Sequence, residues 1–164
     1  MRLAFWSCTI ALLLAAMPAQ ATVHNFVINL DGLQETPPVA TPGTGTGTAT
    51  LDDVTNFFEW EYSFQDLIGT TTDAHFHGPA AIGVGPAGIR LGVSFPAGVT
   101  SGSDSGSAIL DNTQEAELLA GLWYLNIHST FRPGGEIRGQ VIIPEPATLG
   151  LLLVGGLAML RRRS

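Results

Sequence analysis

The chain has 164 residues and a formal net charge of −7, and all seven of its basic residues are arginine. Four of those arginines lie near the two ends, so residues 22–143 hold three arginines against thirteen acidic residues, a net charge of −10. A field of this sign repels phosphate backbones, so no nucleic-acid partner is expected. The length allows one domain with a single hydrophobic core.

Residues 1–21 are typical of a secretory signal peptide. Arg2 supplies a positive charge, residues 3–16 form an apolar stretch, and Ala19 and Ala21 mark a small-x-small cleavage site for signal peptidase. The alternative is an uncleaved membrane anchor, but the stretch is shorter than the roughly 20 residues that span a bilayer. We therefore expect cleavage after Ala21. Because Cys8 is the only cysteine, the mature domain should contain no disulfide.

Residues 22–65 alternate apolar and polar side chains, which predicts three strands. The first covers residues 25–30 and ends at a turn signal. The second, residues 43–51, is rich in Thr and Gly and is either a low-complexity linker or a strand packed closely against a neighbour. The alternation continues into Leu51, which favours the strand. The third places an aromatic residue at every second position, and we interpret these as buried core: Phe58, Trp60, Tyr62 and Phe64.

The rest of the body predicts more strands and one helix. Residues 101–107 are expected to be a flexible connection. Asn112 caps a short helix with Glu115 at the capping-box position, and Gly121 ends it. The last two strands form a hairpin. The predicted elements are strands at 73–77, 89–95, 108–110, 122–128 and 136–143, and a helix at 113–120.

Seven or eight short strands separated by turn signals predict an all-β domain over residues 22–143. The expected architecture is an antiparallel Greek-key β-sandwich with one short helix.

Polar side chains recur on one face of two predicted strands. In residues 73–77, His75 and His77 project together while Ala74 and Phe76 point the other way. In residues 122–128, Asn126 and His128 share a face in the same manner. We expect one polar cluster that consists of Asp73, His75, His77, Asn126, His128, Glu136 and Arg138.

This cluster has two interpretations, and the first is a metal site. Two histidines spaced two residues apart on a strand, with a third from a neighbouring strand, form a set of three ligands that suits Zn or Cu with an open position. His75, His77 and His128 are therefore candidate ligands. Asp73 or Glu136 is the candidate for a group that orients one of them.

The second interpretation is a structural hydrogen-bond network. The imidazoles and Asn126 would then satisfy backbone groups, and Arg138 would pair with Glu136, Asp73 or another acid. No serine has a nucleophile-elbow context and no acid pair indicates a general acid, so hydrolytic activity is not expected. The sequence leaves the metal site and the network open, and no cofactor beyond Cu or Zn is indicated.

Four segments together resemble the CHRD domain, which is named after chordin and is widespread in bacterial exported proteins. The resemblance covers about residues 24 to 143. It implies an all-β domain without an established catalytic activity, known in chordin as part of an extracellular regulator. The segments are Leu30–Val39, Ala74–Ala80, Gly121–Ser129 and Gly135–Gln140.

The run His75-Phe76-His77 also resembles locally the His-x-His strand of copper/zinc superoxide dismutases, which are Greek-key β proteins. Residues 22–143 contain four histidines, too few for the usual dinuclear site of those enzymes, and they lack the disulfide. Dismutase activity is therefore not expected.

Residues 144–164 resemble the PEP-CTERM sorting tail of exported bacterial proteins. A Pro-Glu-Pro motif (Pro144, Glu145, Pro146) precedes an uncharged apolar segment, residues 147–160, which we expect to form a short hydrophobic helix in the membrane. A basic cluster follows, and it favours the cytoplasmic side. The resemblance implies recognition by an exosortase and cleavage near the motif. The basic residues are Arg161, Arg162 and Arg163.

Two functions of different class follow from these observations. In the first, the protein is a non-catalytic cell-surface or extracellular-matrix protein that contacts exopolysaccharide or other exported proteins. In the second, it is a periplasmic or surface protein that binds Cu or Zn through His75, His77 and His128. The first function requires no special site.

Overall fold

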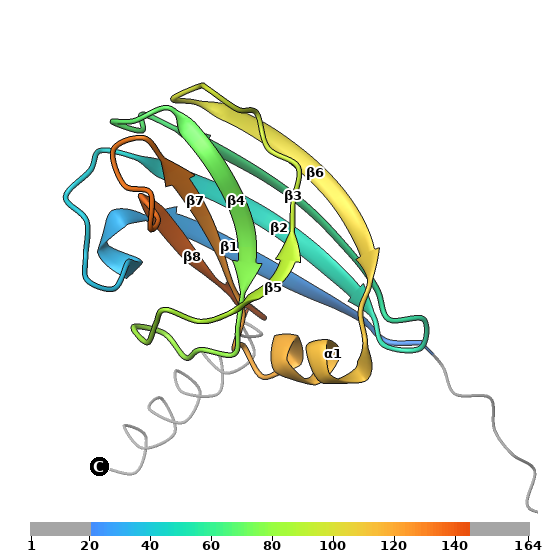
Figure 1. Cartoon of the computed structure of the whole chain (residues 1–164). Coiled ribbons are helices and arrows are strands. Elements are labelled where there is room, and N and C mark those ends of the chain that lie inside the picture. Colours follow the sequence, from blue (N-terminus) through green and yellow to red (C-terminus); the bar gives the residue numbers. More distant parts are fainter. Residues whose placement is uncertain (1–20, 145–164) are drawn as a thin grey trace, which may run out of the picture.

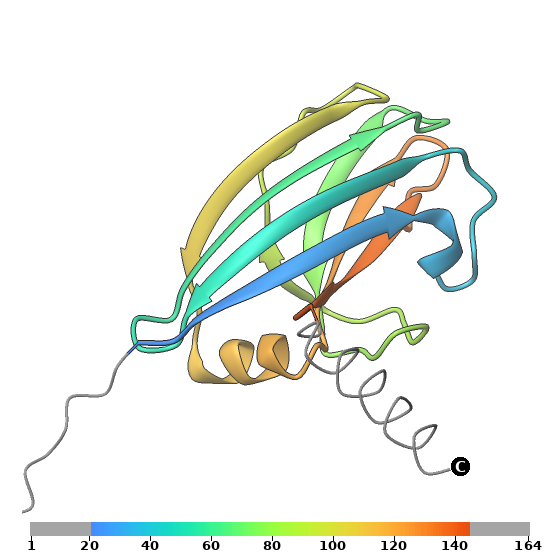
Figure 2. The same cartoon turned by 180° about the vertical axis from the view of Figure 1, so that it is seen from behind.

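The alternating segments form one antiparallel sheet in the computed structural model, which describes residues 21–144. The strands are β1 (Val23–Asp31), β2 (Thr44–Asp52), β3 (Phe57–Gln65), β4 (Thr71–His77), β5 (Ile89–Gly92), β6 (Gly102–Ile109), β7 (Tyr124–Ser129) and β8 (Ile137–Ile142). They are hydrogen-bonded in the order β5-β4-β7-β8-β1-β2-β3-β6 (Figures 1 and 2). The predicted signal segment up to Gln20 and the predicted sorting tail from Glu145 onward lie outside the described residues.

The sheet curls until its two halves face each other across the core, which gives the all-β, sandwich-like fold that the sequence predicted (Figure 1). Phe58 and Trp60 of β3 each lie 5.5 Å from Phe76 of β4, measured between ring centroids, although β3 and β4 are not neighbours in the sheet. Trp123 lies 6.0 Å from Phe58 and from Phe76. The predicted aromatic core is confirmed, and edge-to-face contacts close the curl.

The Thr-rich segment forms strand β2, paired with β1 and with β3 over its whole length, so the strand interpretation is confirmed. Its threonines face outward. Small residues face the core, where Gly45 and Gly47 lie beneath the side chains of Leu30 and Ile28.

Strand β6 was not predicted over most of its length, because residues 102–107 were interpreted as a flexible connection. The structure pairs all eight residues of β6 with β3. The strand lies at the edge of the sheet and none of its residues is buried, so it carries no apolar periodicity to detect. Gly106 in this strand has a steric role, since a Cβ there would lie 2.6 Å from the Trp60 ring.

The helix α1 (Asn112–Leu119) begins one residue earlier than predicted. Its N-cap is Asp111, whose carboxylate accepts hydrogen bonds from the Thr113 and Gln114 amides, and Gln114 completes the capping box. The predicted cap at Asn112 with Glu115 was therefore wrong by one position. Gly121 follows the helix with a φ of +69°, as its expected role requires.

A second, unpredicted helical turn, η1 (Gly32–Gln34), follows β1 and is capped by the Asp31 carboxylate. Within residues 21–144, no helix has the length and apolar character needed to cross a membrane.

A buried carboxylate joins three loops at one end of the sheet. Glu136, which is fully buried, accepts hydrogen bonds from the Thr41 hydroxyl (2.6 Å), from the Ile68 and Gly69 amides (2.7 and 3.2 Å) and from the Ser129 hydroxyl. The sequence predicted Glu136 beside the histidines or Arg138, but the structure directs its carboxylate to these loops. Burial raises the pKa of Glu136, yet the four hydrogen bonds outweigh burial and hold the pKa below its ordinary value.

Replacing this carboxylate should destabilise the domain. We expect Glu136→Gln to lower the free energy of unfolding at neutral pH by about 1–3 kcal/mol, because an amide cannot accept from all four donors. The folded-state pKa is depressed, so the contribution of Glu136 is complete above its unfolded-state pKa and is lost as the pH falls through the folded-state pKa. The stability difference between wild type and variant should therefore shrink in acid.

Urea denaturation at several pH values measures this difference. The matched control is Glu59→Gln, which removes the same charge from an exposed position on β3. Equal losses of stability in the two variants would contradict the role assigned to Glu136.

Candidate metal centre

Three histidines lie together on the outer face of two neighbouring strands, as the sequence predicted. In the β4–β7 pair, Asp73 is opposite His128, His75 is opposite Asn126, and His77 is opposite Tyr124. Ala74 and Phe76 of β4 alternate with the histidines and are fully buried in the core. The two-residue period of the strand therefore sends the imidazoles away from the core.

The ring nitrogens of the three histidines come close to one another. The Nδ1 atom of His75 lies 3.2 Å from the Nε2 atom of His128. One nitrogen from each of His75, His77 and His128 lies within 4.8 Å of the other two. His24, the fourth histidine of the chain, is elsewhere and lies 3.4 Å from the Asp53 carboxylate.

Hydrogen-bond partners determine which nitrogen of two of these rings carries the proton. The Nδ1 atom of His128 lies 2.8 Å from the Pro133 carbonyl oxygen, and the Nδ1 atom of His77 lies 3.0 Å from the Ala87 carbonyl oxygen. A carbonyl oxygen only accepts, so Nδ1 is the donor in both rings. In the neutral rings, Nε2 therefore carries a lone pair, and the Nε2 atom of His77 is buried without a hydrogen-bond partner.

His75 has the opposite tautomer. Its Nε2 atom lies 3.0 Å from the Asp73 carboxylate, which accepts its proton and leaves the lone pair on Nδ1. The 3.2 Å contact between His75 Nδ1 and His128 Nε2 thus brings two acceptor nitrogens together. Neutral rings cannot form a hydrogen bond there. A cation between them would use both lone pairs.

This arrangement fits a transition-metal ion with nitrogen ligands. An ion about 2.05 Å from both His75 Nδ1 and His128 Nε2 would have an N–metal–N angle of about 100°, near the tetrahedral value. The His77 nitrogen, which lies within 4.8 Å of the other two, would complete a tetrahedral face by moving closer to them. Asp73 would orient His75 from behind, as carboxylates commonly do for metal-binding histidines.

Burial disfavours the charged form of two of the three rings, His77 and His128. Burial lowers the pKa of His77, and the nearby charges of His128, His75 and Arg138 lower it further, against the hydrogen bond to Ala87. Burial also lowers the pKa of His128. Neutral imidazole is the form that binds a metal, so both shifts favour metal binding at neutral pH.

Arg138 and Asn126 lie on the same outer face but do not complete the predicted ion-pair network. Arg138 is buried and donates hydrogen bonds to the Val84 carbonyl (2.9 Å) and to the Gln140 side chain (3.3 Å). Within the described residues, no carboxylate lies within 4 Å of its guanidinium, so the expected pairing with Glu136 or Asp73 is not found. Asn126 donates weakly to the Gly134 carbonyl at 3.5 Å, and its Oδ1 atom is buried without a partner.

Two buried residues, one on this face and one in a loop, were not predicted as part of the site from the sequence. Tyr124 stacks on His77 with 5.1 Å between ring centroids, and the Arg138 guanidinium lies 3.5 Å from the centroid of the tyrosine ring. Tyr124 alternates with Asn126 and His128, so the period of the strand was the signal that could have found it. Glu35 is also buried, and burial raises its pKa to about 7 against the attraction of Arg138. Glu35 lies in a loop, where no periodicity points to it.

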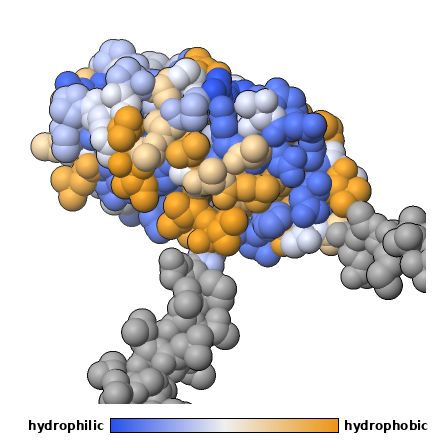
Figure 3. All heavy atoms as spheres, turned by 90° about the horizontal axis from the view of Figure 1, so that it is seen from below, coloured by the Kyte–Doolittle hydropathy of each residue, from blue (hydrophilic) through white to orange (hydrophobic). Residues whose placement is uncertain are grey.

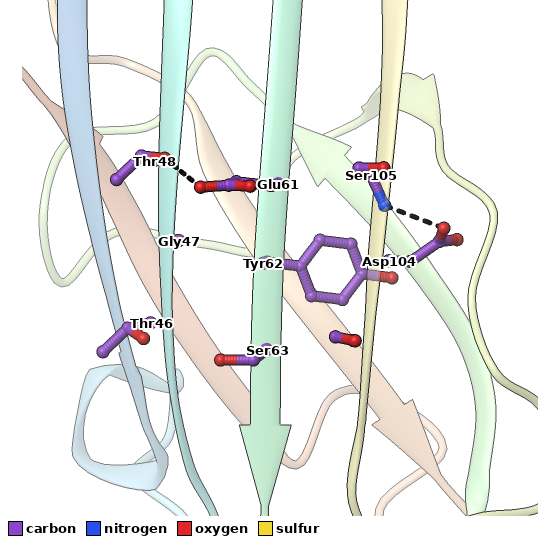
Figure 4. Close-up of a pocket in the computed structure, with 9 residues that line it drawn as sticks. Thr46, Gly47, Thr48, Glu61, Tyr62, Ser63, Asp104 and Ser105 are labelled. Atoms are coloured by element: carbon purple, nitrogen blue, oxygen red, sulfur yellow. Dashed lines mark hydrogen bonds between the residues drawn. The ribbon is translucent and has the colours of Figure 1, made fainter.

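One hollow in the described part of the chain lies on other strands. It has a volume of about 580 Å³ and opens on the outer face of β2, β3 and β6 (Figure 4). The Thr48 hydroxyl donates to Glu61 at 3.2 Å and the Ser105 amide donates to Asp104 at 2.8 Å, so its polar groups bond one another. No histidine lines it. The histidine cluster therefore remains the candidate for chemistry.

Comparison with known proteins gives one match. The CHRD domain family matches residues 26–141, which is most of the chain and nearly all of the described sheet. No curated protein and no solved structure matches the sequence. The match includes β4, β7 and the whole histidine cluster, and the chain therefore belongs to the CHRD domain family.

Proposed function

We propose that this CHRD domain binds one copper or zinc ion through His75, His77 and His128. The proximity of three imidazole nitrogens supports this most directly, because one nitrogen from each ring lies within 4.8 Å of the others and the facing nitrogens of His75 and His128 are both acceptors. An extra proton on His75 or His128 would allow a hydrogen bond between these two rings. It would still leave the buried Nε2 atom of His77 without a partner. A structural network normally satisfies such atoms.

The donor set also bears on which ion binds. Three neutral imidazoles suit both Cu and Zn, and the general order of affinities favours Cu(II) where both are available. The side chains of His75 and Asp73 are 16% and 49% exposed, so the solvent side of the site is open to a further ligand. The proposal is metal binding, and it assigns no catalytic step.

The cellular setting is a proposal from sequence alone. We propose that signal peptidase removes residues 1–21 and that the apolar segment 147–160 holds the precursor in the membrane. An exosortase would then cut near Pro144-Glu145-Pro146, and the domain would remain at the cell surface or in the extracellular matrix, beside exopolysaccharide or other exported proteins. The support is the order of motif, apolar segment and basic cluster.

Metal binding predicts a change in thermal stability. An ion that binds only the folded state at a hundredfold excess over its Kd should stabilise the domain by about 2.7 kcal/mol. We expect Cu(II) or Zn(II) to raise the melting temperature of the wild type above its value in chelator, and His77→Ala to abolish the rise. His24→Ala is the matched control, since His24 is outside the cluster. A wild type that melts at one temperature with Cu(II), Zn(II) and chelator would refute metal binding.

Asp73 should tune the affinity of the site. In Asp73→Ala, no carboxylate fixes the tautomer and the orientation of the His75 ring. We therefore expect the affinity for the metal to fall by about 10- to 100-fold. Competition with a chromogenic chelator measures this loss. Asp53→Ala is a suitable control, because it removes a carboxylate from the other His–Asp contact at His24. Equal affinities of Asp73→Ala and wild type would show that Asp73 does not orient a ligand.

Mass spectrometry tests the proposed processing. In a host with an exosortase, the surface form should begin near Thr22 and lack residues 147–164. Detection of an intact 147–164 segment on that form would contradict the processing step, while export itself would still be supported by an N-terminus near Thr22.

A further inference from the structure

The loop between β4 and β5, together with the first residue of β5, forms an apolar exposed part of the described chain. Residues 78–89 contain no charged side chain, in a domain with a net charge of −10 over residues 22–143. Ile82, Val84 and Ile89 are 69%, 56% and 56% exposed. Exposed apolar groups in such a sequence indicate a surface that contacts something less polar than water.

The backbone of this loop is held in place while its apolar side chains face outward. The Val84 carbonyl accepts a hydrogen bond from the buried Arg138 at 2.9 Å, and the Val84 amide donates to the Ala81 carbonyl at 3.0 Å. At the base of the loop, the Gly78 amide donates to the Gly88 carbonyl at 3.0 Å. The exposure of Ile82 and Val84 is thus a property of an ordered loop.

The last strand ends at the same end of the sheet. Figure 1 shows the loop between β4 and β5, the end of β8 and α1 together at the lower end of the domain. Ile142 and Ile143 are 37% and 45% exposed there. Figure 3 shows apolar residues gathered on this underside, around the point where the chain leaves the described part. We call Ile82, Val84, Ile89, Ile142 and Ile143 the underside patch.

The sequence after β8 limits how far this patch can be from a membrane. Only residues 143–146 separate Ile142 from the apolar segment 147–160. Four residues span at most roughly 14 Å when fully extended. If segment 147–160 enters the bilayer, the underside patch must lie close to the lipid headgroups.

We propose that the underside patch rests on the outer surface of the membrane while segment 147–160 is inserted, so that the loop between β4 and β5 dips into the lipid interface. This inference rests on the membrane anchoring in the proposed function and is independent of metal binding. The partner is a lipid bilayer, because the patch is uncharged, surrounds the exit of the chain and is tied to the apolar segment by a short spacer.

Single-cysteine labelling tests this docking, since residues 22–164 contain no native cysteine. The variants Ile82→Cys and Ser103→Cys of residues 22–164 are each labelled at the new cysteine with an environment-sensitive fluorophore. The labelled proteins are then bound to vesicles of phosphatidylethanolamine and phosphatidylglycerol. Both positions are exposed, and Ser103 lies on the outer face of edge strand β6. We expect the label at 82, and not at 103, to shift its emission to the blue and to be quenched by lipids that carry a spin label.

Three other outcomes would refute the docking, and one of them would also refute the anchoring. If the chain floats with the vesicles and the label at 82 remains as water-exposed as the label at 103, the docking is refuted. A blue shift without lipid quenching also refutes it, because a second copy or segment 147–160 would then cover the patch. Failure to float would refute the anchoring as well. The melting temperature of the same samples is measured with and without Cu(II) or Zn(II). A cooperative melt shows that the domain is folded, and a rise with metal tests the histidine site independently of docking.

Discussion

Aromatic packing across the curled sheet is the constraint on which the rest of the molecule depends. Phe58 and Trp60 from one half of the sheet meet Phe76 and Trp123 from the other half, with centroid distances of 5.5–6.0 Å where the halves touch. These contacts fix which face of β4 and β7 points inward. Because side chains alternate along a strand, burying Phe76 places His75 and His77 outside, and a shift of one residue would exchange them.

Loops then convert this outer face into a partly buried environment. The loop between β4 and β5 supplies carbonyl groups to His77 and Arg138, and the loop between β7 and β8 supplies the Pro133 carbonyl to His128. Arg138 stacks on Tyr124, which stacks on His77. Burial disfavours protonation of His77 and His128, and the charge of Arg138 adds to this effect at His77. These two rings are therefore available in the neutral form that binds a metal ion.

The same bonds explain why a structural network and a metal site are difficult to separate by residue type alone. A structural network and a metal site both need backbone acceptors for the ring N–H groups and a carboxylate behind one ring. The direction of the remaining lone pairs separates them. Here the lone pairs of His75 and His128 point at each other and that of His77 is enclosed without a donor, a combination that protein groups alone leave unsatisfied.

The sequence alone predicted much of the fold and the membership of the histidine cluster. A two-residue period is a local property, so β1, β2, β3, β4, β7 and β8 could be located, and His75, His77, Asn126 and His128 could be assigned to one face. Most of the edge strand β6 was not predicted, because none of its residues is buried and no apolar period marks residues 102–107.

Only the tertiary structure decided the partners of the buried charges. Glu136 bonds Thr41, 95 positions earlier in the chain, and Arg138 bonds Val84, 54 positions earlier. Such bonds depend on where loops cross the sheet, which no local pattern encodes. The tautomers of His77 and His128 were decided in the same way, because each proton is placed by a loop carbonyl that folding brings to the ring, that of Ala87 or of Pro133. For His75 the acceptor is Asp73, two residues earlier, which the sequence had offered as a candidate.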